Sequence, residues 1–210
     1  VPLPLLLPFD EGLVTTVSQG RSSEPTHQGP QAYAWDFAVP EGTAVHASAP
    51  GVVVWVKDDS EIHGPEEQLA SAANWIAVDH GAGLYSVYVH LAFDSAQVEP
   101  GDMVTAGTHL AHTGLSGQLT GPNLHFHVEN VWSETVPARF IDDDGCDHDP
   151  LEGEEVERAE GLRDVLLGPE EPSLLPFSTF AHAGVLRIED LPGRLLKLAV
   201  KIHLLIEVRV

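Results

Sequence analysis

Histidine and aspartate residues at four separate places in the sequence have the side chains that bind or assist a catalytic zinc ion. His27 and Asp36 flank a turn, with Asp36 opening the apolar run "DFAV", and His90 ends the run "YSVYVHL". His125 lies inside "GPNLHFHV". A catalytic zinc site takes three His or carboxylate ligands and leaves one position open for water or substrate. Two histidines and one aspartate would supply these ligands, and a further histidine would transfer a proton or hold a developing oxyanion.

The elements that must position these residues are predicted to be short β-strands. Between Pro40 and Val131, β-rich runs such as "GVVVWVK", "NWIAVDH" and "LYSVYVHL" alternate with glycine-containing turns. No long stretch of this region has the period of a helix. The polar segment 57–74 is expected to be a long loop between two strands. We therefore predict a mainly β protein built on a compact antiparallel β sandwich, similar to a barrel-sandwich hybrid.

Composition divides the chain into three parts. Residues 1–140 are expected to form the main domain. Residues 141–172 are expected to be an acidic linker or loop, because ten acidic residues and one basic residue occupy positions 142–160. Residues 173–210 are expected to form a small β extension of unknown role, since apolar and polar residues alternate along the last 16 positions.

The cysteine count and the acidic segment limit other metal sites. The single cysteine, Cys146, excludes an intrachain disulfide and a zinc site made of four thiolates. The run "DDDGCDHD" offers the carboxylates that calcium prefers, but its spacing differs from that of a twelve-residue calcium loop. Calcium is therefore the weaker interpretation of this run.

Charge and hydropathy exclude two classes of partner. The formal net charge of -22 argues against nucleic acid, whose phosphates require Lys and Arg. The apolar opening "VPLPLLLP" is too short to span a membrane and is not an intact signal peptide, although it could follow one that has been removed. We expect a monomer without a transmembrane segment.

Several short segments, which follow one another along the sequence, resemble motifs of one enzyme family. "AWDFAVPEGTAVHASAPGVVV", "HGAGLYSVYVHL", "VEPGDMVTAG" and "TGPNLHFHV" are similar to the lysostaphin-type, or LytM-type, zinc metallopeptidases, which cleave peptide cross-links in bacterial cell walls. The resemblance runs from about Leu7 to Val131. It implies a duplicated hybrid motif in the fold, Zn²⁺ as cofactor, and peptidoglycan as partner. It also implies an exported protein, periplasmic or extracellular, of bacterial origin.

The resemblance implies a role for each candidate residue. His27, Asp36 and His125 match the three zinc ligands, and His90 matches one of two active-site histidines that do not bind zinc. The second of these falls on Asn123, because "GP" and "LHF" fix the register of "GPNLHF". An asparagine can donate a hydrogen bond but cannot carry a proton at neutral pH. His127 lies two residues beyond the ligand on the same face of the strand, on the far side from the place of the family's second histidine.

Two functions follow from these assignments. The first is a zinc-dependent metalloendopeptidase that hydrolyses peptide cross-links or stem peptides of peptidoglycan, with His90 and Asn123 as catalytic residues. The alternative is a catalytically impaired, zinc-binding module that binds peptidoglycan or regulates other wall enzymes, and Asn123 is the residue that favours it. A biotin or lipoyl carrier domain, which "VEPGDMVTAGT" also resembles, is set aside because the hairpin-tip lysine of such domains is missing.

Overall fold

The computed structural model describes residues 3–141 and 147–158. The chain divides by its internal contacts into a unit from Val1 to Pro169 and a unit from Glu170 to Val210. The second unit lies outside the described residues, and so does the β extension expected from residue 173. Most of the acidic run "DDDGCDHD" is also outside them, so the calcium interpretation receives no structural test.

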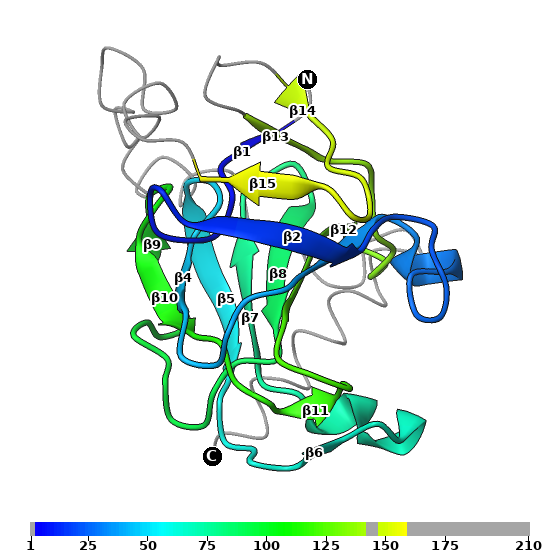
Figure 1. Ribbon diagram of the computed structural model, residues 1–210. Helices are drawn as coiled ribbons and strands as arrows, with labels where there is room; N and C mark the ends of the chain where they lie inside the picture. The colour runs from blue at the N-terminus through cyan, green and yellow to red at the C-terminus, as the bar shows by residue number, and fades with distance from the viewer. Residues whose placement is uncertain (1–2, 142–146, 159–210) are drawn as a thin grey trace, which may run out of the picture. The chain divides into compact units, whose positions relative to one another are not determined.

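One large twisted sheet carries the described part of the chain (Figure 1). Each pair of neighbouring strands in it is antiparallel. In spatial order, its eight strands are β15 (Glu155–Glu157), β2 (Val14–Gln19), β3 (Ala34–Phe37), β12 (Leu124–Asn130), β8 (Leu84–Val89), β7 (Trp75–Asp79), β5 (Gly51–Lys57) and β9 (Met103–Val104).

Shorter strands form three small sheets beside the large one. In the first, β13 (Arg139–Ile141) pairs with both β1 (Pro4–Leu5) and β14 (Asp147–His148). The other two pair β4 (Ala44–His46) with β10 (His109–His112), and β6 (His63–Gly64) with β11 (Gly117–Gln118). Two 3-10 helices, η1 (Gly29–Gln31) and η2 (Glu67–Ala72), complete the described elements. Segment 57–74 is therefore only partly the loop expected from its polarity, because its middle contains β6 and η2.

The core lies between the large sheet and the small sheets. Along β12, Leu124, Phe126 and Val128 are buried in this core, and they share it with Val45 from β4 and Leu110 from β10. Successive side chains of a strand point to opposite faces, so the intervening residues of β12 face away from the core. Two layers of β structure around one core confirm the predicted antiparallel β sandwich.

Within residues 141–172, which are expected to be an acidic linker or loop, the structure contains the strands β14 and β15. β15 pairs with β2 at the edge of the large sheet (Figure 1). Its central Val156 is buried in the core while the glutamates on either side are exposed. The buried guanidinium of Arg158 donates hydrogen bonds to the carbonyls of Leu7 at 2.6 Å and Phe9 at 3.3 Å. The acidic composition did not indicate a strand here, because the carboxylates occupy its solvent-facing positions.

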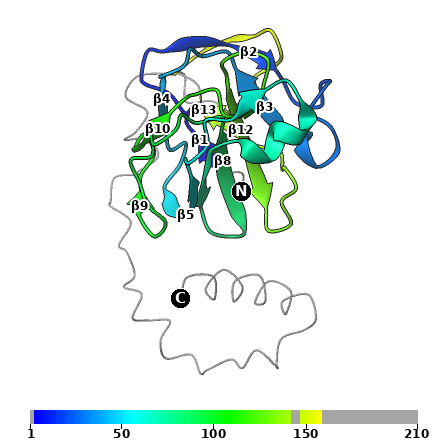
Figure 2. The ribbon, with the colours of Figure 1, turned by 90° about the horizontal axis from the view of Figure 1, so that it is seen from below.

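η2 marks one side of the cavity described below. Figure 2, seen from below, shows η2 in front of the central strands of the large sheet. Ala70 of η2 and Ala73, which follows it, line the same cavity as His125 of β12.

Within the described residues, no helix is both long enough and apolar enough to cross a membrane.

Candidate metal centre

Two adjacent strands and one loop bring three candidate ligands together. Asp36 of β3 and His125 of β12 are direct partners in the register of the antiparallel pair. Both face away from the hydrophobic core, because the residues on either side of each are buried in it. His27 belongs to the segment between β2 and η1, and its side chain is fully buried. The strand pairing thus sets two of the positions and the packed segment before η1 sets the third.

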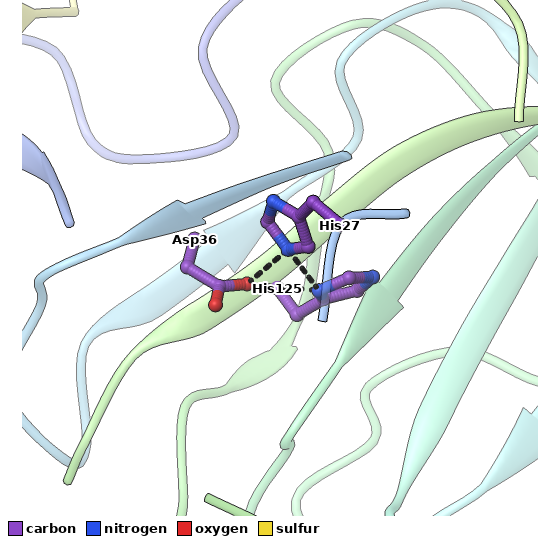
Figure 3. Close-up of side chains that lie close together, drawn as sticks. All are labelled: His27, Asp36 and His125. Carbon is purple, nitrogen blue, oxygen red and sulfur yellow. Dashed lines mark hydrogen bonds and ion pairs between the residues drawn. The ribbon is translucent and has the colours of Figure 1, made fainter. Parts of the chain in front are cut away.

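The three side chains converge on one point (Figure 3). His125 Nδ1 lies 2.8 Å from Asp36 Oδ1, and His27 Nε2 lies 3.3 Å from the same oxygen. The two ring nitrogens are 3.4 Å apart. The three atoms all lie within 4.8 Å of one another, so one ion can contact all of them.

The second nitrogen of each ring determines which nitrogen is free to bind a metal. His27 Nδ1 lies 2.8 Å from the carbonyl of Gly20. A carbonyl only accepts hydrogen bonds, so Nδ1 must carry the proton, and Nε2 of the neutral ring is left with its lone pair. His125 Nε2 contacts His127 Nδ1 at 3.0 Å, which leaves Nδ1 of His125 directed at Asp36. Two imidazole nitrogens and one carboxylate oxygen, with both outer nitrogens engaged, fit a zinc ion.

The electrostatics favour an ionised carboxylate at the centre. Burial by itself would raise the pKa of Asp36, but hydrogen bonds from His125 and His27 outweigh it and hold the pKa well below its usual range. Burial would lower the pKa of His27, but the hydrogen bond and charge of Asp36 outweigh that effect and raise it. Burial dominates for His125 and lowers its pKa. In the metal-free chain, Asp36 is therefore an anion that holds a proton on His27 more readily than on His125.

His90 lies beside this cluster at the end of β8. Its ring centroid is 6.2 Å from that of His125, and its Nδ1 lies 2.8 Å from the carbonyl of Ser116. Nδ1 must again be the donor, so Nε2 of the neutral ring is an acceptor. Burial, followed by the charge of His125, lowers the pKa of His90 and favours the neutral ring. The backbone φ of His90 is +66°, a left-handed conformation that is uncommon for residues other than glycine and concentrates at functional sites.

Asn123 lies just before β12, at the same cavity. Its Nδ2 donates a hydrogen bond to the carbonyl of Gly121 at 3.1 Å. Its Oδ1 is buried and has no hydrogen-bond partner among the described protein atoms. The amide is thus oriented through the carbonyl of Gly121.

A cavity of about 460 Å³ joins these residues. Its polar lining includes Asp36, His90, Asn123, His125 and His127. The remaining walls come from the ends of β2, β8 and β11, from η1 and η2, and from the segments beside these elements, with lining residues Gln19, Pro25, Thr26, Gln31, Pro65, Ala70, Ala73, Val89, Gln118, Leu119 and Thr120. Four of the five residues predicted for the site therefore line one cavity, and the fifth, His27, contacts Asp36 and His125.

Some groups that shape the site were missed from the sequence. The carbonyls of Gly20 and Ser116 orient His27 and His90, and backbone acceptors carry no signal in a sequence. Glu129, which lies near His127, could have been found, because positions 125, 127 and 129 share one face of a strand.

A second group of histidines, His46 and His109 with His112, packs ring against ring on β4 and β10. None of these three lines the cavity described above.

Known proteins are similar to the central part of the chain. The model of peptidase family M23 matches residues 30–137. The peptidoglycan DD-endopeptidase ShyB of Vibrio cholerae is 33% identical over 93 residues, which cover 44% of this chain and 19% of that protein. The DD-carboxypeptidase/endopeptidase Mpg of Neisseria meningitidis is 33% identical over 94 residues, with the same coverage of 44% and 19%. The match thus spans about a fifth of the length of these relatives.

A solved structure gives a weaker likeness. A zinc-containing peptidase from Vibrio cholerae is 26% identical, with a TM-score of 0.45. The superposition covers 64% of this chain and 39% of that one.

Proposed function

The chain belongs to peptidase family M23, and from this premise we propose that it is a zinc-dependent endopeptidase that hydrolyses peptide cross-links or stem peptides of bacterial peptidoglycan. The observation that carries the proposal is the convergence of His27 Nε2, Asp36 Oδ1 and His125 Nδ1 within 4.8 Å. The name of the relative ShyB, a peptidoglycan DD-endopeptidase, supports the choice of substrate.

Each residue of the site has a task in this proposal. His27, Asp36 and His125 hold the zinc ion, which when bound would polarise the scissile carbonyl and activate water. His90 accepts a proton at Nε2 during the attack of water and returns it to the leaving amine, because its Nδ1 is held by the carbonyl of Ser116. Asn123 donates a hydrogen bond from Nδ2 to the developing negative charge but transfers no proton.

Hydrolysis of purified peptidoglycan tests this function. The zinc-loaded chain is expected to release new amino groups, to stop when a chelator removes the metal, and to resume when zinc is added back. Asp36→Asn provides a control because it removes one ligand while keeping the shape of the side chain. If a chain with one bound zinc ion releases no amino groups, the proposed hydrolysis is wrong.

The alternative function rests on Asn123. An asparagine at this position removes one route for proton transfer, and this favours a module that binds peptidoglycan or regulates other wall enzymes with little turnover of its own. Sedimentation with insoluble peptidoglycan distinguishes the two functions. Binding without the release of amino groups by the zinc-loaded chain would support the alternative.

The compartment and the assembly follow from the same proposal. Peptidoglycan lies outside the cytoplasm, so we infer an exported bacterial protein that acts in the periplasm or the extracellular space. We further propose that the chain acts as a monomer, since His27, Asp36 and His125 all come from one chain. Light scattering of the purified protein would test the assembly.

A further inference from the structure

His127 lies directly behind the candidate ligand His125 on strand β12. The two rings have centroids 5.2 Å apart and meet at 73°. His127 is 5% exposed, and its partners in the strand register are Ala34 of β3 and Val87 of β8, both buried. The imidazole is therefore confined between two apolar neighbours, and its hydrogen-bonding groups must find partners along its own strand.

The contacts of His127 run along one face of β12. His127 Nδ1 lies 3.0 Å from His125 Nε2, and His127 Nε2 lies 3.6 Å from Glu129 Oε2. His127 Nε2 is itself buried and makes no hydrogen bond among the described protein atoms. The carboxylate of Glu129 is an acceptor that lies just beyond hydrogen-bond length from it. Residues 125, 127 and 129 consequently form a row from the metal site toward the far end of the strand.

The proton positions follow from the ligand at the head of this row. When Nδ1 of His125 binds a metal, its Nε2 carries a proton and acts as a donor. Nδ1 of His127 must then accept, which places the proton of His127 on Nε2, the nitrogen that faces Glu129. Each ring is left in one tautomer, and the ring of His125 is held at both ends.

We propose that His127 is a positioning residue for the zinc ligand His125, and that Glu129 orients His127 in turn. The inference rests on zinc binding as set out in the proposed function. A partner on the outer nitrogen fixes the rotation of a ligand ring and increases its basicity, and removing such a partner costs about 10- to 100-fold in metal affinity or activity.

The same geometry argues against His127 as a substitute for the missing proton carrier at Asn123. His127 contacts Nε2 of His125, whereas Asp36 contacts Nδ1 on the other side of that ring. Its Nδ1 is engaged by the ligand and its Nε2 is buried against Glu129. Neither nitrogen is available to a substrate, so His127 acts through His125.

Zinc affinity measured by competition with a chromophoric chelator tests this role without reference to hydrolysis. His127→Leu fills the slot but accepts no hydrogen bond, and we expect its zinc dissociation constant to rise about 10- to 100-fold. His127→Gln keeps an acceptor oxygen and is expected to bind zinc within about 3-fold of the native chain. His112→Leu replaces a half-buried histidine outside the cavity and is expected to bind zinc as the native chain does. Thermal unfolding of each metal-free variant identifies losses that come from the fold.

The outcomes separate this inference from the proposed function. Native affinity in His127→Leu would overturn the positioning role, and so would an equal loss in His127→Leu and His127→Gln, which would assign the effect to packing. A native chain that binds no zinc would overturn both proposals. Zinc binding without hydrolysis would remove the proposed enzyme activity and leave the positioning role standing.

Discussion

Replacing Asn123 by histidine should convert a hydrogen-bond donor into a proton carrier. Asn123 lines the same cavity as His90 and His125, and its Nδ2 donates to the carbonyl of Gly121 at 3.1 Å. An imidazole in its place can donate from Nδ1 to the same carbonyl and present Nε2 to the cavity. The native Oδ1 has no described protein partner, so the substitution breaks no hydrogen bond at that atom.

The expected gain follows from the size of acid-base catalysis. A positioned acid or base contributes about 10²- to 10⁴-fold to the rate, or about 3 to 5 kcal/mol of barrier. We expect kcat of Asn123→His to rise by at least about 100-fold, with KM changed by less than about 3-fold. The introduced imidazole would act in proton transfer and not in binding of the substrate's ground state, so we expect the change in kcat and not in KM.

The assay compares zinc-loaded native chain, Asn123→His and Asn123→Gln on purified cross-linked peptidoglycan fragments. Zinc content is measured first, so that equal loading is established, and the release of amino groups then gives kcat and KM. Asn123→Gln keeps the amide and cannot carry a proton, so it should show no gain. If Asn123→His is fully loaded and no faster than the native chain, the register of "GPNLHF" or the role assigned to position 123 is wrong.

Three further predictions follow from the described contacts. His90→Ala should bind zinc normally and lose about 10²- to 10⁴-fold in kcat, as measured on the same fragments, whereas an unchanged kcat would remove His90 from proton transfer. The folded-state pKa of Asp36 lies below its usual value of 3.8, so its ionised form stabilises the metal-free fold above that pH, and the contribution is lost as the pH falls below it. Thermal unfolding in chelator should therefore show a steeper loss of stability below about pH 4 for the native chain than for Asp36→Asn, and parallel curves would contradict this. Arg158→Met should lower the free energy of unfolding by about 1 to 3 kcal/mol, because the buried carbonyl of Phe9 would lose its donor and that of Leu7 would keep only the amide of Phe9, and a loss under about 0.5 kcal/mol in urea would show that the carbonyl of Phe9 regains water.

The sequence was sufficient to predict which side chains of the candidate site lie close together. The segments around His27, Asp36, His90 and His125 predicted that these residues lie close together. The strand register that pairs Asp36 with His125 accounts for part of this proximity. Alternation along "LHFHV" also placed His127 on the face of the ligand. These signals are local, since a strand alternates with a period of two whatever lies around it.

The features that escaped prediction depend on contacts between distant parts of the chain. The carbonyl of Gly20 orients His27 only because the loop folds back over it, and composition carries no trace of such a contact. β15 escaped because its pairing with β2 and the burial of Val156 are long-range, while its glutamates gave the segment the composition of a linker. The exposed glutamates of this edge strand dominate the composition of the segment, which therefore reads as acidic although Val156 is buried.

The pairing of β15 with β2 and the hydrogen bonds of Arg158 with Leu7 and Phe9 have a consequence for the extent of the folded domain. These contacts join segments that lie near the beginning and near the end of the described residues. The segment 30–137 that matches the family lacks both of these outer strands. A fragment cut to the family match would lose these contacts, so the folded unit is larger than the match and includes residues 7–19 and 155–158.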